Sequence, residues 1–134
     1  MKFWNDLDGS TFFNQVFTTP IAINMIELFT ISIDNNRPTI IIEFDICELP
    51  DAPPTKWKKS EFNTCRIGLN CGGISDLKIN NIPTKEKLNI TITKKENLFI
   101  VHASNKDSLI EFTTKFPLLC GPSVYMNDSN SEAT

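Results

Sequence analysis

The chain has 134 residues, of which 40% are hydrophobic. That length suits a single domain, and that composition is typical of a globular protein and excludes a disordered one. No apolar run approaches the ~20 residues of a membrane-spanning helix, and the first residues lack the apolar stretch of a secretory signal, so we expect a cytoplasmic location and no membrane partner. The net charge of −3, without a basic stripe, argues against nucleic acid as the partner.

The negative charge is concentrated at the start of the chain. Residues 1–51 contain eight acids and two bases, a net charge of −6, whereas residues 52–134 contain eight acids and eleven bases, a net charge of +3. The acidic first third is either a surface that faces a basic partner or a set of solvated loop and strand-edge residues. Composition alone favours neither alternative.

The first predicted element is a helix over about residues 10–18. Ser10 stands at its start as an N-cap, and Pro20 ends it. Its apolar residues recur at the spacing of one helical face: Phe13, Val16 and Phe17. We expect this helix to pack on a sheet, with Trp4 covering one end.

From about residue 25 to residue 126, apolar and polar residues alternate in short runs, which predicts strands. The clearest runs are residues 39–47 and 63–71. A change of phase within residues 26–33 predicts a β-bulge, and residues 34–38 are typical of a hairpin loop.

These patterns define the expected fold class. Helices do not alternate with the strands, which excludes a parallel sheet. We predict a mainly β protein, an antiparallel β-sandwich or open half-barrel of seven to eight strands with a short N-terminal helix. A single domain is expected to span residues 1–134, with a disordered tail over residues 127–134.

A proline-rich connector lies between the two clearest strands. Residues 49–54 contain three prolines, which predicts a rigid, extended segment. It leads to Trp57, which stands among three lysines. Trp57 is either a lid over the edge of the core, the commoner role for tryptophan, or an exposed anchor for a partner.

The reactive residue types do not form a recognisable catalytic or metal-binding motif. The four cysteines lack the Cys-x-x-Cys spacing of a metal site, and we predict that Cys65 and Cys71 are small core residues on one strand face. His102, the only histidine, is more typical of a hydrogen-bonded sheet residue than of a catalytic base. Glu43 and Asp45 share a strand face, where paired carboxylates are usually solvated. We therefore expect no enzymatic activity, metal or cofactor.

Several short motifs occur in an order that resembles one known family. The motifs are Phe44-Asp45, residues 49–54, Lys56-Trp57, Phe62-Asn63 and Leu77-Lys78-Ile79. An early Trp and a Phe-rich helix precede them, and Tyr125 supplies an aromatic near the end. In this order they resemble the immunity protein 50 family, whose members are bacterial proteins encoded beside polymorphic toxins, including those of contact-dependent growth inhibition.

The resemblance implies an antidote that binds the C-terminal domain of one cognate toxin in a 1:1 complex and covers its active site. Many such toxins are nucleases, whose substrate channels are basic because they hold phosphate. Acids of the first third are therefore our candidates for the toxin face, with Trp57 as an anchor if it is exposed. The candidate residues are Glu43, Asp45, Glu48, Asp51, Trp57, Asp6 and Asp8.

Two rival functions remain open at this stage. A β-domain that binds a lipid or carbohydrate requires an aromatic-lined cavity inside the sheet. A small hydrolase requires His102 beside one of the cysteines.

Overall fold

The computed structural model of the chain describes residues 1–128. Within them lie a 3-10 turn, η1 (Trp4–Asp6), and two short helices, α1 (Thr11–Val16) and α2 (Thr55–Lys58). The strands are β1 (Met25–Asp34), β2 (Thr39–Ile46), β3 (Thr64–Gly72), β4 (Ser75–Asn80), β5 (Lys87–Lys95), β6 (Leu98–Ser104), β7 (Leu109–Thr114) and β8 (Phe116–Tyr125). The last six residues of the predicted tail, 129–134, lie outside the described residues.

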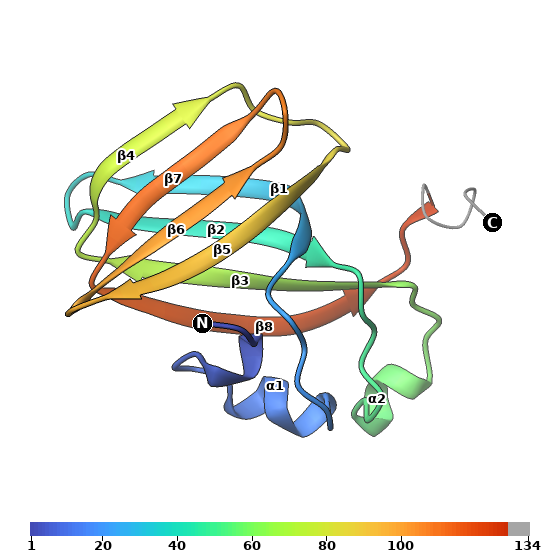
Figure 1. The fold of residues 1–134 in the computed structure, drawn as a ribbon. Helices are drawn as coiled ribbons and strands as arrows, with labels where there is room; N and C mark the ends of the chain where they lie inside the picture. Colours follow the sequence, from blue (N-terminus) through green and yellow to red (C-terminus); the bar gives the residue numbers. More distant parts are fainter. Residues whose placement is uncertain (129–134) are drawn as a thin grey trace.

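All eight strands form one antiparallel sheet in the order β4-β7-β6-β5-β1-β2-β3-β8, and the sheet is not closed. Figure 1 shows it bent so that β4, β7, β6 and β5 cross over β1, β2, β3 and β8, with α1 and α2 below β8. The predicted mainly β fold is confirmed. Of the two predicted architectures, the structure has the open half-barrel and not a sandwich of two separate sheets. Three of the pairings, β1 with β5, β3 with β8 and β4 with β7, join strands that are not consecutive in the chain.

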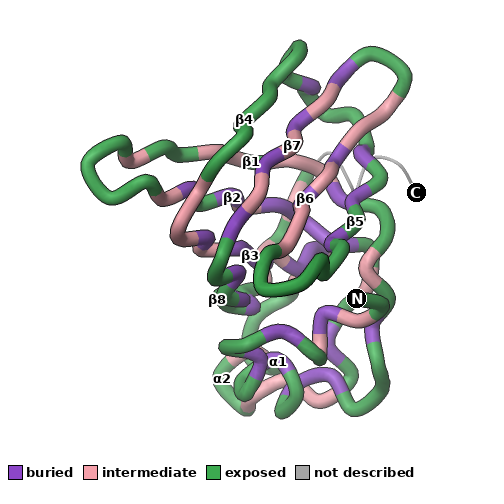
Figure 2. The backbone as a smooth tube through the Cα atoms, turned by 60° about the vertical axis from the view of Figure 1, so that its left-hand side comes forward, coloured by how far each residue is buried: buried purple, intermediate pink, exposed green. Residues whose placement is uncertain are grey.

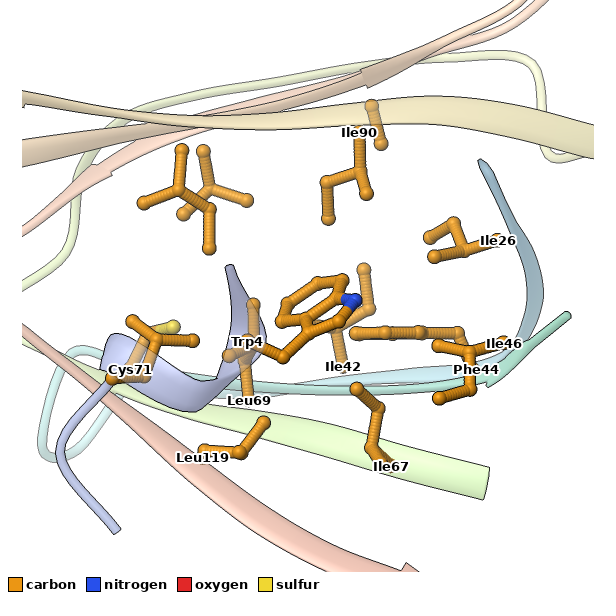
Figure 3. Close-up of a cluster of buried hydrophobic side chains, with 14 of the residues drawn as sticks. Trp4, Ile26, Ile42, Phe44, Ile46, Ile67, Leu69, Cys71, Ile90 and Leu119 are labelled. Carbon is orange, nitrogen blue, oxygen red and sulfur yellow. The ribbon is translucent and has the colours of Figure 1, made fainter. Parts of the chain in front are cut away.

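The core lies between the two halves of the bent sheet, where the alternating apolar residues face one another. Trp4 is inserted among them, 1% exposed, with its ring centroid 5.3 Å from that of Phe44 (Figure 3). The N-terminal segment spans the open side of the sheet: the Met1 amino group donates to Ile92 O at 2.9 Å, and Leu119 N donates to Asp8 O at 2.8 Å. The first residues of the chain therefore complete a core that the sheet alone leaves open.

The predicted N-terminal helix is confirmed as α1. Its apolar side is buried, and the rings of Phe13 and Phe17 stack with their centroids 4.5 Å apart. Ser10 occupies the N-cap position, but its hydroxyl donates to Asn5 O at 2.9 Å and makes no cap bond. The hydroxyl thus ties η1 to α1.

The proline-rich connector, residues 49–54, contains no helix or strand, and a short helix that was not predicted follows directly after it. Thr55–Lys58 form the short helix α2, with Pro54 at its N-cap position, because proline is compatible with a helix start although it disrupts a helix interior. Trp57 is half-buried and packs edge-on against the Phe12 ring, with their centroids 5.6 Å apart. It also packs against the core cluster, which is the lid arrangement.

The local features predicted for the first two strands are confirmed. The register between β1 and β2 shifts between Leu28 and Thr30, which leaves Phe29 as the bulged residue. Residues 34–38 connect the two strands as a hairpin.

Figure 2 shows β4 exposed along its length, whereas buried and half-buried residues alternate along β7. Neither helix of residues 1–128 has the length and apolar character needed to cross a bilayer.

The four thiols are all free, and they divide into two buried and two exposed groups. Cys65 and Cys71 are fully buried, which confirms their prediction as core residues. This burial raises the pKa values of both thiols to about 12. We expect an alkylating reagent at neutral pH to modify Cys47 and Cys120 in the folded protein, and all four thiols in denaturant. Mass spectrometry counts the adducts, and rapid native modification of Cys65 or Cys71 would contradict this packing.

Candidate functional site

The side chains that alternate with the core residues of β1, β2, β3 and β8 form a second surface, which we call the outer face. Cross-strand pairing places Asp45 of β2 opposite Arg66 of β3, and Arg66 opposite Ser123 of β8. The Phe29 bulge adds an aromatic ring to the same side, 55% exposed and lying over Arg66. The outer face thus combines charged, aromatic and small side chains from distant parts of the sequence.

An ion pair with a tyrosine lies at one end of this face, near the end of β2, the start of β3 and the end of β8. Arg66 Nε lies 2.8 Å from Asp45 Oδ1, and the Tyr125 hydroxyl donates to Asp45 Oδ2 at 2.6 Å. The guanidinium carbon is 3.5 Å from the centroid of the Phe29 ring and 4.7 Å from that of Tyr125. Only 10% of the Asp45 side chain is exposed, so the expectation of a solvated carboxylate is wrong here, because Arg66 and the Tyr125 hydroxyl bind both of its oxygens.

The network changes the protonation behaviour of its members. Burial, followed by the hydrogen bond to Asp45 and the negative charge of Asp45, raises the pKa of Tyr125 to about 12. Burial lowers the pKa of Arg66, but the hydrogen bond and charge of Asp45 outweigh it and leave this pKa above its ordinary value. Arg66 therefore keeps its positive charge and Tyr125 keeps its proton at neutral pH.

Tyr125 is the only tyrosine of the chain, so its titration can be followed directly. We expect its tyrosinate absorbance band to develop near pH 12 in the folded protein and near the ordinary value of about 10 after unfolding. Because the folded state holds this proton more tightly, the associated stability is present below pH ~10 and is lost as the pH rises through about 12. Asp45→Asn should shift the folded titration toward the ordinary value, and an unchanged titration would contradict the network.

Three hollows follow one another across the outer face. The largest, about 840 Å³, lies between the Phe29–Arg66–Tyr125 cluster and the segment before β5 that contains Ile82 and Lys85. Arg66 also lines the second hollow, about 310 Å³, and Ile41 lines both the second and the third, about 280 Å³. Their lining residues come from the strands, from Arg37 in the β1–β2 hairpin, and from residues 82–85 and 126–128, and none comes from α1 or α2. We call this continuous depression the outer groove.

The structure does not bring the seven predicted partner residues into one cluster. Glu43 and Asp45 lie on the outer face, and Glu48 follows β2. Asp51 accepts hydrogen bonds from the backbone N–H and the hydroxyl of Thr18, which lower its pKa. Trp57 belongs to α2, while Asp6 and Asp8 line a separate hollow of about 230 Å³ with Lys94 and Phe99.

Sequence reasoning missed the residues that organise the outer face. Arg66 and Tyr125 are 59 positions apart, and only the β3–β8 pairing brings them together. The change of phase in β1 was a signal for Phe29, but the position of its ring over Arg66 depends on the fold.

His102 lies on the other half of the sheet, in β6, within a small network. Its Nδ1 is 2.9 Å from Glu111 Oε1 and its Nε2 is 3.1 Å from Ser104 Oγ. The hydrogen bond with His102 is the main cause that lowers the pKa of Glu111. A serine, a histidine and a carboxylate in this order recur in hydrolases, but such chemistry also requires a substrate pocket. His102 lines none of the four hollows described here.

Comparison with known proteins identifies the family. Neither a curated protein nor a solved structure matches the chain. The family description Immunity protein 50 matches residues 9–125, which run from the turn before α1 to the end of β8 and include the whole outer face of the strands. The chain therefore belongs to the Immunity protein 50 family.

Proposed function

We propose that this chain is an immunity protein that binds and neutralises one cognate toxin domain by covering its active site. The observation that carries the proposal is the family match over residues 9–125. The proposed complex contains one copy of each protein, forms in the cytoplasm and requires no cofactor. In this proposal the chain itself binds neither nucleic acid nor a membrane.

We further propose that the toxin is a nuclease, in agreement with the distribution of charge. Residues 1–51 have a net charge of −6, and the active site of a nuclease is basic because it binds phosphate. Opposite potentials on two proteins accelerate their encounter, and ionic strength weakens this effect. The proposed toxin face draws on the predicted acids, of which Glu43 and Asp45 line the outer groove beside Arg66.

The packing of the core bears on the lipid or carbohydrate alternative. That function needs an aromatic cavity inside the sheet, but Phe13, Phe17, Phe44 and Phe112 are at most 3% exposed and pack in one cluster with Trp4. The hydrolase alternative needed a cysteine beside His102, whose ring nitrogens instead form hydrogen bonds with Glu111 and Ser104. Both observations favour a binding surface over an internal site.

The decisive experiment expresses this chain together with the toxin domain encoded beside its gene. We expect co-expression to restore growth and the purified proteins to form a 1:1 complex by light scattering. Toxins from unrelated loci serve as controls and should remain active. Failure of this chain to restore growth, in cells that contain it at high level, would overturn the proposed function.

A further inference from the structure

We propose that the outer groove is the surface on which the basic face of the toxin domain docks, and that Glu43 lies at its centre. This inference rests on the proposed function and deepens it, because it selects one surface of the chain. The proposal is carried by three observations: the continuity of the groove, its charge, and the kinds of side chain that line it.

The groove offers a continuous area of sufficient size. Its three hollows are joined by Arg66 and Ile41 across four adjacent strands. Four strands about 4.8 Å apart and about eight residues long cover roughly 19 by 26 Å. This projected area of about 500 Å² approaches the ~800 Å² of accessible surface that each partner contributes to a standard interface.

The charge of the groove specifies a basic occupant. Glu43 accepts a hydrogen bond from the Thr30 hydroxyl at 3.2 Å, and among residues 1–128 it forms no ion pair. The nearby base, Arg66, is already bound to Asp45. The largest hollow has two further acids, Glu27 and Asp128, and one further base, Lys85. At the third hollow the base Arg37 is paired with Asp34 at 3.5 Å. A lysine or arginine of the partner would therefore find complementary charge above Glu43.

The side chains around Glu43 are suited to a protein partner. Phe29 and Ile82 are 55% and 56% exposed at the largest hollow, and aromatic residues and arginine are common at the energetic centres of interfaces. Gly68 and Ser123 line the second hollow, where their small size leaves room for an inserted side chain. The Asp45–Arg66–Tyr125 network holds the floor of this groove in one arrangement.

The edge of the sheet formed by β4 is a poorer docking site. Asp76 of β4 has a positive φ of 53°, and the pairing of β4 with β7 shifts between Ser75 and Lys78. Lys78 itself is 3.6 Å from Glu111. Irregular edges that carry lysine resist the addition of another strand, so β4 is protected rather than prepared for pairing.

The test measures binding of the toxin domain that passes the growth experiment, purified with its active site inactivated. We expect Glu43→Lys and Ser123→Trp each to raise the Kd by at least about 30-fold, as for disruption of a desolvated charge pair or a filled pocket. Glu96→Lys makes the same charge change in the β5–β6 turn and should leave the Kd within about twofold. Thermal unfolding of each variant shows whether it is folded.

A second measurement requires no change within the groove. Cys120 is exposed and lines the second hollow, so in a Cys47→Ser background its alkylation rate reports access to the groove. We expect bound toxin to slow this alkylation by at least about tenfold, in line with the exclusion of water from interface centres.

The outcomes separate the two proposals. Unchanged affinity of both groove variants, with Cys120 still alkylated at the free rate in the complex, overturns the groove and leaves the proposed function intact. If only Asp6→Lys and Asp8→Lys weaken binding, the groove proposal is also overturned, because the toxin then binds at the hollow that these two acids line. Absence of any complex with the wild-type chain overturns both proposals.

Discussion

Replacing Trp4 with alanine is expected to lower the free energy of unfolding by about 3–5 kcal/mol, the usual cost of removing a large aromatic side chain from a core. Trp4 is 1% exposed, and it packs between the halves of the bent sheet. Its loss leaves a cavity that the neighbouring strands cannot fill, because their positions are set by backbone pairing. Urea unfolding followed by circular dichroism measures the change.

Phe116→Ala is the matched control for this prediction. Phe116 is also aromatic but 69% exposed, so its removal should change the free energy of unfolding by no more than about 0.5 kcal/mol. A loss below about 1 kcal/mol in Trp4→Ala would show that the N-terminal segment does not complete the core.

Arg66→Met is expected to destabilise the protein by about 2–3 kcal/mol, because it leaves the Asp45 carboxylate covered and without its ionic partner. The cost is below that of a fully buried pair, since 20% of the Arg66 side chain is exposed. The same variant should move the Tyr125 titration to higher pH, because the positive charge of Arg66 lowers the pKa of Tyr125 while burial and Asp45 raise it.

The double variant Asp45→Leu/Arg66→Met distinguishes the cost of an unpaired charge from the value of the pair. We expect it to recover most of the lost stability, because replacing both members of a covered ion pair by apolar residues is often neutral or stabilising. Glu43→Gln, on the same strand face, keeps the hydrogen bond from Thr30 and should be nearly neutral. Equal losses in the single and double variants would contradict this interpretation. If stability recovers while toxin affinity does not, the network serves binding more than folding.

The features of the fold that were predictable from sequence are those that depend on neighbouring residues. The alternation in β2 and β3, the bulge at Phe29 and the apolar side of α1 all follow from side-chain periodicity. Helix α2 was missed because three prolines dominate the local pattern, and the packing of Trp57 on Phe12 is not local.

The candidate site was less predictable. Asp45 was correctly placed on a strand face away from the core, but its burial depends on Arg66, which is 21 residues away, and on Tyr125, which is 80 residues away. Whether an acid is solvated or covered is decided by the side chains opposite it, and cross-strand partners cannot be read from one strand.

The sequence by itself determined the strand segments, the antiparallel class, the short helix and the resemblance to the immunity protein 50 family, because periodicity and short motifs are properties of contiguous residues. Tertiary structure alone decided that β1 pairs with β5 and β3 with β8, and thereby which residues line the outer groove. The physical reason is that strand order depends on how the apolar faces of all strands are buried together. Trp4, near the N-terminus, completes the core that these faces form.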